Sequence, residues 1–212
     1  MTALVNGGHV PRTSFQDAAN LILSRKRGVV LIATGFYIAK ACATETDGPP
    51  GAAALGFALQ RLGFTPVYVT DRYSRAAVAA CAGPTAQVVS FPITSPELSL
   101  DFAKGLLAGL KPALLISVER CGVGSDGKYR NMLGVDFSEY NARIDTLFDL
   151  AACGEKGIPS IGIADGGNEI GCGDLVEKGA IPAADPERLK SPPSVTKTTK
   201  LVVAAASNWG AY

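Results

Sequence analysis

Six short apolar runs along the chain predict buried β-strands. Each run is nearly continuous in apolar residues instead of alternating with polar ones, which is typical of strands covered on both faces. The predicted strands are Val29–Ala33, Val67–Thr70, Gln87–Ser90, Ala113–Val118, Ser160–Ala164 and Leu201–Ala205.

Segments with apolar residues at helical spacing separate these runs. Leu98, Phe102, Leu106 and Leu110, for example, fall on one face of a helix. Helix-breaking Gly and Pro residues lie close to the ends of several of these segments. The predicted helices are Phe15–Arg27, Gly51–Leu62, Tyr73–Ala82, Pro96–Leu110, Ser138–Cys153 and Asn168–Lys178.

Strand–helix alternation at these lengths predicts one α/β domain over residues 1–212. We expect a doubly wound, mostly parallel, six-stranded and Rossmann-like sheet with helices on both faces. The segment Ile181–Thr199, rich in Pro, Lys and Ser, predicts a lid or an irregular surface loop. Ser207–Gly210 predicts a turn after the last strand. Because a helix should follow there and the chain stops at Tyr212, we expect the C-terminal part of the domain to be missing.

The composition narrows the class of protein. The chain has 212 residues, 47% of them hydrophobic, and a net charge of +1, which gives no basic face for nucleic acid. We find no apolar run of the roughly 20 residues that a membrane span needs. The five cysteines form no CxxC pair, so we expect reduced thiols in an intracellular protein. A zinc site is not expected, because the single histidine is His9 near the terminus.

Acidic and amide residues follow the predicted strands beside glycines. The most informative run is AlaAspGlyGlyAsnGluIleGly at residues 164–171, directly after an apolar strand. Because ligands bind at the carboxyl edge of parallel sheets, these residues indicate a site. The alternative interpretation is a glycine-rich turn with a helix cap.

Carboxylates crowded at one edge repel one another and are stabilised by a cation. The candidate ligands are Glu45, Asp47, Glu119, Asp165 and Glu169. Oxygen ligands without histidine favour Mg²⁺, Mn²⁺ or Ca²⁺, and we expect Mg²⁺ or Mn²⁺ as cofactor. Each acid also has a structural alternative. Glu45 and Asp47 could cap the next helix, Glu119 could pair with Arg120 or Arg143, and Asp165 could bind turn amides.

A basic segment follows Glu119. Lys128 and Arg130 could neutralise a small anionic substrate, or belong to a solvated loop. Cys121 lacks a histidine to activate it as a nucleophile. The ThrGly pair at residues 34–35 lacks the glycine spacing of a nucleotide site.

Six motifs together resemble the D-glutamate cyclase family. They are ThrGlyPhe at 34–36, GluThrAspGlyProProGlyAla at 45–52, GluArgCysGly at 119–122, AspGlyLysTyrArgAsnMet at 126–132, AspGlyGlyAsnGluIleGly at 165–171 and SerAsnTrpGly at 207–210. The resemblance covers nearly the whole chain and is closest to the family's C-terminal domain. It implies conversion of D-glutamate to 5-oxo-D-proline and water, and a domain that continues past Tyr212.

On this basis we expect two sets of site residues. The expected catalytic residues are Asp165, Glu169, Glu119 and Asp126. The expected substrate-binding residues are Thr34, Gly35, Lys128, Arg130, Asn131, Gly166, Gly167, Asn168 and Asn208. We further expect a cytoplasmic protein, located in the mitochondrial matrix if the source is a eukaryote, and an assembly of identical subunits as one option.

Two other functions fit the same acidic edge. A phosphatase that depends on Mg²⁺ or Mn²⁺ would use the cation to hold a small phosphate monoester while a carboxylate activates water. A non-catalytic module would bind a small ligand or a metal without turnover. The three hypotheses differ in their products, which are 5-oxoproline, inorganic phosphate and none.

Overall fold

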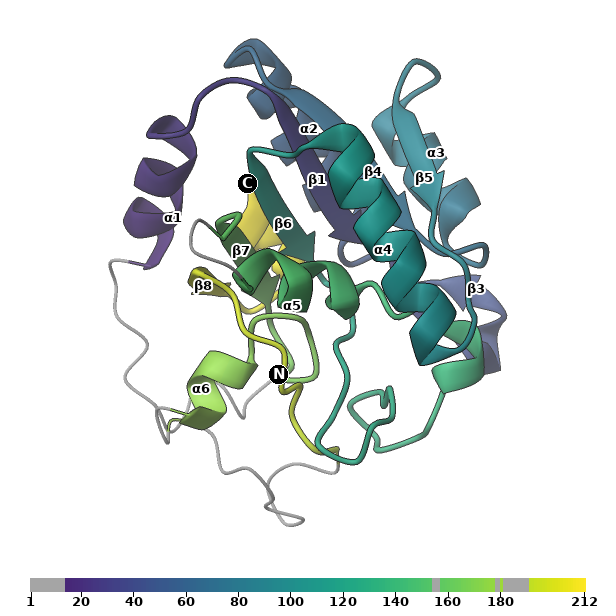
Figure 1. Ribbon diagram of the computed structural model, residues 1–212. Helices are drawn as coiled ribbons and strands as arrows, with labels where there is room; N and C mark the ends of the chain where they lie inside the picture. Colours follow the sequence, from purple (N-terminus) through teal and green to yellow (C-terminus); the bar gives the residue numbers. More distant parts are fainter. Residues whose placement is uncertain (1–13, 154–156, 178–179, 181–190) are drawn as a thin grey trace.

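The structure is a computed structural model that describes residues 14–153, 157–177, 180 and 191–212. Six parallel strands form the main sheet in the order β5-β4-β1-β6-β7-β8 (Figure 1). Their bounds are β1 Val29–Thr34, β4 Thr65–Thr70, β5 Gln87–Ser90, β6 Leu114–Val118, β7 Ser160–Ala164 and β8 Lys200–Val203. The predicted fold class is confirmed. All six predicted strands exist, with ends shifted by at most two residues.

The strand order places a topological switch at the centre of the sheet. From β1 the chain moves outward through β4 to β5, then crosses back to β6 on the other side of β1. In open α/β sheets, ligands bind at such a switch point, at the carboxyl ends of the strands. The predicted acidic residues follow these two strands and β7.

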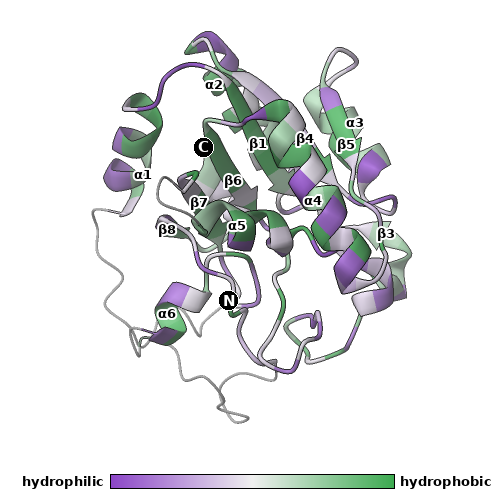
Figure 2. Ribbon diagram, viewed as in Figure 1, coloured by the Kyte–Doolittle hydropathy of each residue, from purple (hydrophilic) through white to green (hydrophobic). Residues whose placement is uncertain are grey.

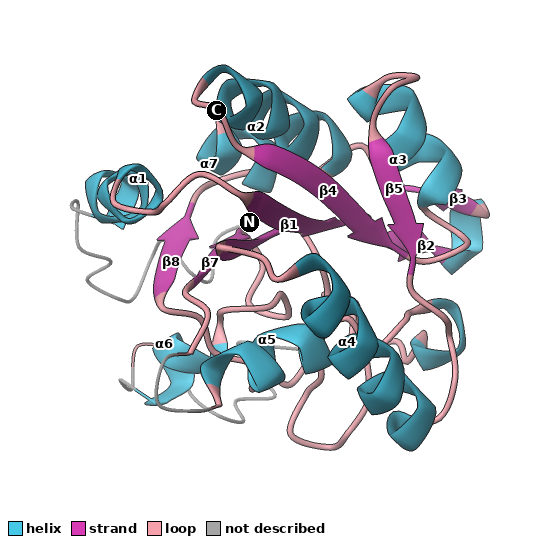
Figure 3. Cartoon of the chain, turned by 45° about the horizontal axis from the view of Figure 1, so that its top comes forward, coloured by secondary structure: helices cyan, strands magenta, loops and turns pink. Residues whose placement is uncertain are grey.

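Two helical layers enclose the sheet (Figure 3). One layer holds α1 Ser14–Leu23, α2 Pro49–Arg61, α3 Arg75–Ala82 and α7 Ser207–Ala211. The other holds α4 Pro96–Leu110, α5 Asp145–Ala152 and α6 Gly173–Glu177. After β1 the chain forms a small hairpin of β2 Tyr37–Ile38 and β3 Ala43–Thr44 around the 3-10 turn η1 Ala39–Ala41. A second 3-10 turn, η2, covers Ser138–Tyr140.

Successive residues of a strand pack into two separate hydrophobic cores, one on each face of the sheet. Val30 and Ile32 of β1 pack with the first helical layer, and Leu31 and Ala33 pack with the second. This period of two arises because successive side chains of a strand point to opposite faces. The strands and the inward helix faces are accordingly hydrophobic (Figure 2). Among the described residues, none of the helices combines the length and apolarity of a membrane-crossing segment.

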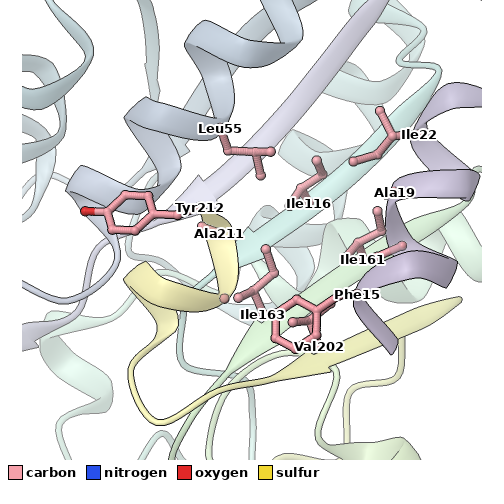
Figure 4. Close-up of a pocket in the computed structure, with 12 residues that line it drawn as sticks. Phe15, Ala19, Ile22, Leu55, Ile116, Ile161, Ile163, Val202, Ala211 and Tyr212 are labelled. Carbon is pink, nitrogen blue, oxygen red and sulfur yellow. The ribbon is translucent and has the colours of Figure 1, made fainter. Parts of the chain in front are cut away.

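An apolar cavity of about 260 Å³ lies between the first helical layer and the sheet (Figure 4). Ile22 of α1, Leu55 of α2 and Ile163 of β7 contribute to its walls, together with Ala211 of α7. Its lining is aliphatic and aromatic, and it contains none of the predicted site residues.

Three predicted elements differ from the structure. The helix expected over Ser138–Cys153 is interrupted, because Asn141 adopts an extended conformation with φ −120° and ψ 120°. The helix expected from Asn168 begins only at Gly173, since a tight turn precedes it, and Lys178 lies outside the described residues. The turn expected at Ser207–Gly210 is instead the beginning of α7.

The remaining differences concern ends and connections. Helix α1 ends at Leu23 rather than Arg27, and α3 begins at Arg75 rather than Tyr73. Residues 181–190 of the predicted irregular connection lie outside the described residues, whereas residues 191–199 have no regular secondary structure.

Candidate functional site

Three loops at the carboxyl edge of the sheet bring carboxylates together. Asp47 follows β1, Glu119 follows β6 and Asp165 follows β7, and one oxygen of each lies within 4.8 Å of the others. Glu45 and Glu169 adjoin this triad, since each acts electrostatically on one or more of its members. The five predicted cation ligands therefore form one acidic cluster.

Glu119 is the buried centre of the cluster. It leaves β6 with a left-handed backbone, φ 49°, and only 5% of the residue is exposed. Its Oε2 accepts a hydrogen bond of 2.5 Å from the hydroxyl of Ser207. Burial raises the pKa of Glu119 well above its ordinary value, and the charges of Glu169 and Asp165 raise it further. A positive charge close to Glu119 would offset this cost of burial and like charge.

Two further acids have raised pKa values near neutrality. Burial, followed by the charge of Glu169, raises the pKa of Asp165 to about 8. Burial, followed by the charges of Asp47 and Glu169, raises the pKa of Glu45 to about 7. Desolvation and like charge act in the same direction here, because both disfavour the ionised carboxylates.

Glu169 is fixed by the turn that contains it. Its two oxygens accept hydrogen bonds from the amides of Gly166 at 2.8 Å and Gly167 at 2.7 Å, and the thiol of Cys172 lies 3.5 Å from Oε2. The positive φ of Gly167, 107°, explains why this turn needs glycine. The amides of Gly166 and Gly167, two of the three predicted substrate-binding glycines, are thus engaged by Glu169.

Asp47 and Asn208 hold the loop after β1 against α7. Asp47 accepts hydrogen bonds from the amides of Ser207 at 2.9 Å and Asn208 at 2.7 Å. In return, Asn208 Oδ1 accepts from the amides of Gly48 at 3.0 Å and Gly51 at 2.8 Å, at the start of α2. Asp47 therefore does serve as a helix cap, but for α7 instead of α2.

Thr34 and Gly48 lie against Glu119. A Cβ placed on Gly48 would approach Glu119 Cβ to 2.8 Å and Thr34 Oγ1 to 2.9 Å, and Gly48 has a φ of 100°. Only glycine fits there. The hydroxyl of Thr34 is fully buried and has no hydrogen-bond partner within the described parts of the chain. It is a polar group available to a ligand or a water.

A buried ion pair, absent from the predictions, ties the loops together. Arg120 lies 2.7 Å from Asp71 and donates to the carbonyls of Gly35 at 2.7 Å and Ala142 at 3.0 Å. Both charged side chains are essentially unexposed. Arg120 thus pairs with Asp71, and the alternative pairing with Glu119 is not the one formed. Asp71 is the acid that follows β4, and in dinucleotide-binding enzymes an acid in such a position binds the ribose. Here Asp71 is engaged by Arg120.

The basic segment forms an exposed loop. Arg130 binds Asp126 at 2.8 Å, and Lys128 lies 3.2 Å from Asp136, with about half of the Lys128 side chain exposed. Hydrogen bonds from Arg130 help to lower the pKa of Asp126. Asn131 Oδ1 accepts from two amides of its own turn. Their expected roles in catalysis and substrate binding stay predictions.

Asn168 connects that loop to the acidic cluster. Its side chain is 8% exposed, and its Nδ2 donates to the carbonyl of Arg130 at 2.8 Å. The backbone carbonyl of Asn168 accepts a hydrogen bond from the amide of Gly122 at 2.9 Å. Asn168 therefore sits between the loops that follow β6 and β7, adjacent to Glu169.

Comparisons with known proteins place the chain among relatives. The family model described as D-glutamate cyclase-like, C-terminal, matches residues 8–212. Mitochondrial D-glutamate cyclase from Homo sapiens is 33% identical over 214 residues, which cover 92% of this chain and 33% of that protein. The chain thus spans about a third of that relative's length. The ligand-free aldohexose dehydrogenase of Thermoplasma acidophilum matches with a TM-score of 0.32 and 9% identity over 66% of this chain and 50% of that one. Similarity at that level bears on neither fold nor function.

Proposed function

The chain belongs to the D-glutamate cyclase-like family, and from this premise we propose that it is a lyase that converts D-glutamate to 5-oxo-D-proline and water. We further propose that Mg²⁺ or Mn²⁺ assists the reaction. One observation supports both parts of the proposal, namely the acidic cluster at the ends of β1, β6 and β7. Because the chain spans about a third of its human relative, the activity of that whole protein is carried over as a proposal.

The reaction explains why a cation would be needed. The α-amine of D-glutamate attacks its own γ-carboxyl carbon, a C–N bond forms, and one carboxyl oxygen leaves as water. An ionised carboxylate resists attack because its negative charge repels the nucleophile. A divalent cation bound at the cluster would polarise this group and stabilise the negative charge that develops on its oxygens.

The donor set fits a hard divalent cation. Asp47, Glu119 and Asp165 each offer an oxygen, and the 4.8 Å limit on their separations is compatible with oxygen ligands that close around one ion. Burial of Glu119 and the proximity of Glu169 make the uncompensated carboxylates costly. The unpartnered hydroxyl of Thr34 adds a polar group next to Glu119.

Glu45 is the acid best placed to move a proton. It lies outside the triad, and its pKa of about 7 lets it accept and return a proton near neutral pH. We assign it the two protons that the nitrogen loses in turn, one from the α-ammonium group before the attack and one after the C–N bond has formed. Glu45 delivers both to the departing oxygen, which leaves as water. Glu169, whose two oxygens accept hydrogen bonds from amides, is held in its turn and is not assigned this role.

The basic side chains near the acidic cluster are already paired, which supports a bound cation as the main group that attracts the substrate. Arg120, Lys128 and Arg130 are each already paired with an acid. They offer less to the carboxylates of D-glutamate than free cations would. The acidic cluster would repel an anionic substrate unless a metal ion bridged the two.

Product analysis separates this proposal from its alternatives. Incubation with D-glutamate and Mg²⁺ or Mn²⁺ should give 5-oxoproline, whereas the phosphatase alternative requires phosphate release from monoesters. The comparisons lend no support to that alternative. Ligand binding without either product would identify a non-catalytic module. L-glutamate serves as the stereochemical control.

A further inference from the structure

Ser207 contacts two members of the acidic cluster at once. Its backbone amide donates to Asp47 Oδ2 at 2.9 Å, and its hydroxyl donates to Glu119 Oε2 at 2.5 Å. The residue is fully buried at the first position of α7. Neither the acidic residue types nor their spacing indicates this serine as part of the site.

The two acids that Ser207 contacts come from different parts of the fold. Asp47 lies in the loop after β1, and Glu119 follows β6, so no single element fixes their separation. Ser207 enters from α7 and donates to both. Its hydroxyl also lies 3.3 Å from the carbonyl of Ile163 in β7, the strand that precedes Asp165. Ser207 therefore contacts the acids that follow β1 and β6 and the backbone of β7.

A second group beside Glu119 points to a ligand at this spot. The Thr34 hydroxyl is fully buried, lacks a partner among the described residues, and faces the same space around Gly48 as Glu119 Cβ. Because buried hydroxyls are nearly always hydrogen-bonded, this one is available to a bound group or its water.

We propose that Ser207 is a positioning residue for the cation site. Its hydroxyl holds Glu119 Oε2 and so fixes the orientation of that carboxyl group within the acidic cluster. Its amide holds Asp47, so that Ser207 fixes the two acids relative to each other, with one oxygen of each within 4.8 Å. The inference rests on the cation site of the proposed function, although not on the reaction assigned to it.

The test measures binding of Mn²⁺ alone by calorimetry. Removing a group that orients a metal ligand typically weakens metal binding by about 10-fold to 100-fold. S207A should therefore raise the dissociation constant for Mn²⁺ by about tenfold or more, with a melting temperature that stays close to wild type. S99A is the matched control, because Ser99 is also a fully buried serine but lies in α4, and it should bind Mn²⁺ as wild type does.

Activity with D-glutamate supplies a readout that a purely structural defect would not move. At limiting Mn²⁺, S207A should be slow, and saturating Mn²⁺ should restore most of its turnover. If S207A does not fold, S207C replaces it under the same criteria, because a thiol is a much weaker donor.

Three outcomes would decide the matter. Wild-type affinity for Mn²⁺ in folded S207A or S207C overturns the positioning role. Absence of Mn²⁺ binding by the wild-type protein overturns both the cation site and this role. Weakened Mn²⁺ binding in S207A, together with no 5-oxoproline from the wild type, supports the positioning role while rejecting the reaction.

Discussion

The side chains of Asp47 and Asn208, 161 positions apart in the sequence, cap each other's helices. Asp47 accepts the amide of Asn208 at 2.7 Å, and Asn208 accepts the amides of Gly48 and Gly51 that begin α2. The loop that carries Glu45 and Asp47 is thereby fastened to the C-terminal helix. The geometry of the acidic cluster thus depends on contacts between the two ends of the domain.

Loss of this cap should destabilise the protein. N208A removes the side-chain acceptor of the Gly51 amide and one of the two acceptors of the Gly48 amide, which also donates to Asp47 Oδ1. The free energy of unfolding should therefore fall by about 1–2 kcal/mol. W209A is the control from the same helix, because Trp209 is 65% exposed, and it should change stability by less than about 0.5 kcal/mol. Denaturant titration measures both. Equal stability of the two variants would show that the cap contributes little.

Cation affinity should increase as the pH rises through neutrality. Burial and Glu169 raise the pKa of Asp165 to about 8, so this acid is protonated at lower pH and must lose its proton to bind a metal. The dissociation constant for Mg²⁺ should therefore fall between about pH 6 and pH 8, with protons released on binding. Calorimetry in buffers of different ionisation enthalpy measures both quantities. An affinity that is constant or decreases over this range would argue against Asp165 as a ligand.

Asp145 should make folding sensitive to mildly acidic pH. It is buried, accepts a 2.5 Å hydrogen bond from the hydroxyl of Tyr129, and has a pKa raised to about 6 by its burial. The folded state therefore favours the protonated acid, so this contribution to stability is present below pH 4 and is lost as the pH rises toward 6.

D145N removes this titration. Between about pH 4 and pH 6, the free energy of unfolding of the wild type should decline relative to that of D145N by up to about 3 kcal/mol. D101N, which alters an exposed acid of α4, should follow the wild type. Urea titrations at several pH values measure the difference. If the free energy of unfolding depended on pH in the same way for wild type and D145N, the pKa of Asp145 would not be raised in the folded protein.

The ion pair of Arg120 and Asp71 should show strong coupling. R120M removes the buried cation and leaves Asp71 uncompensated, which typically costs about 3–5 kcal/mol of stability. R120M/D71N should recover much of this loss, because neutral asparagine still offers an acceptor to the amides of Tyr73 and Ser74. A double-mutant cycle on denaturation measures the coupling, and additive effects would contradict it.

The sheet could be predicted because its strands carry a local signal. Ser160–Ala164 and Gln87–Ser90 are apolar runs between turn residues, and their predicted bounds are those of the structure. The meeting of Asp47, Glu119 and Asp165 followed from the rule that loops after parallel strands share one edge.

The differences arise where tertiary contacts override local preference. The helix predicted from Asn168 begins late because Glu169 binds the amides of Gly166 and Gly167, which stabilises a turn instead. The first turn of α7 forms where Asp47 supplies a cap from a distant loop, a contact that no local pattern encodes.

The roles of Ser207 and Arg120 could not be predicted for a related reason. Serine is common in turns and carries no charge, so only its place between Asp47 and Glu119 reveals its contribution. Arg120 is adjacent to Glu119 in the sequence, which suggested that the two side chains pair. In the structure the backbone of Glu119 is left-handed, and Arg120 pairs with Asp71 instead.

The most direct test of the proposed function is to follow its product. The protein should be incubated with D-glutamate in the presence of Mg²⁺ or Mn²⁺, and 5-oxoproline should be followed by chiral chromatography. We predict metal-dependent formation of 5-oxo-D-proline that is lost on addition of a chelator and in D165N. Metal-bound, folded protein that forms no 5-oxoproline from D-glutamate would contradict it.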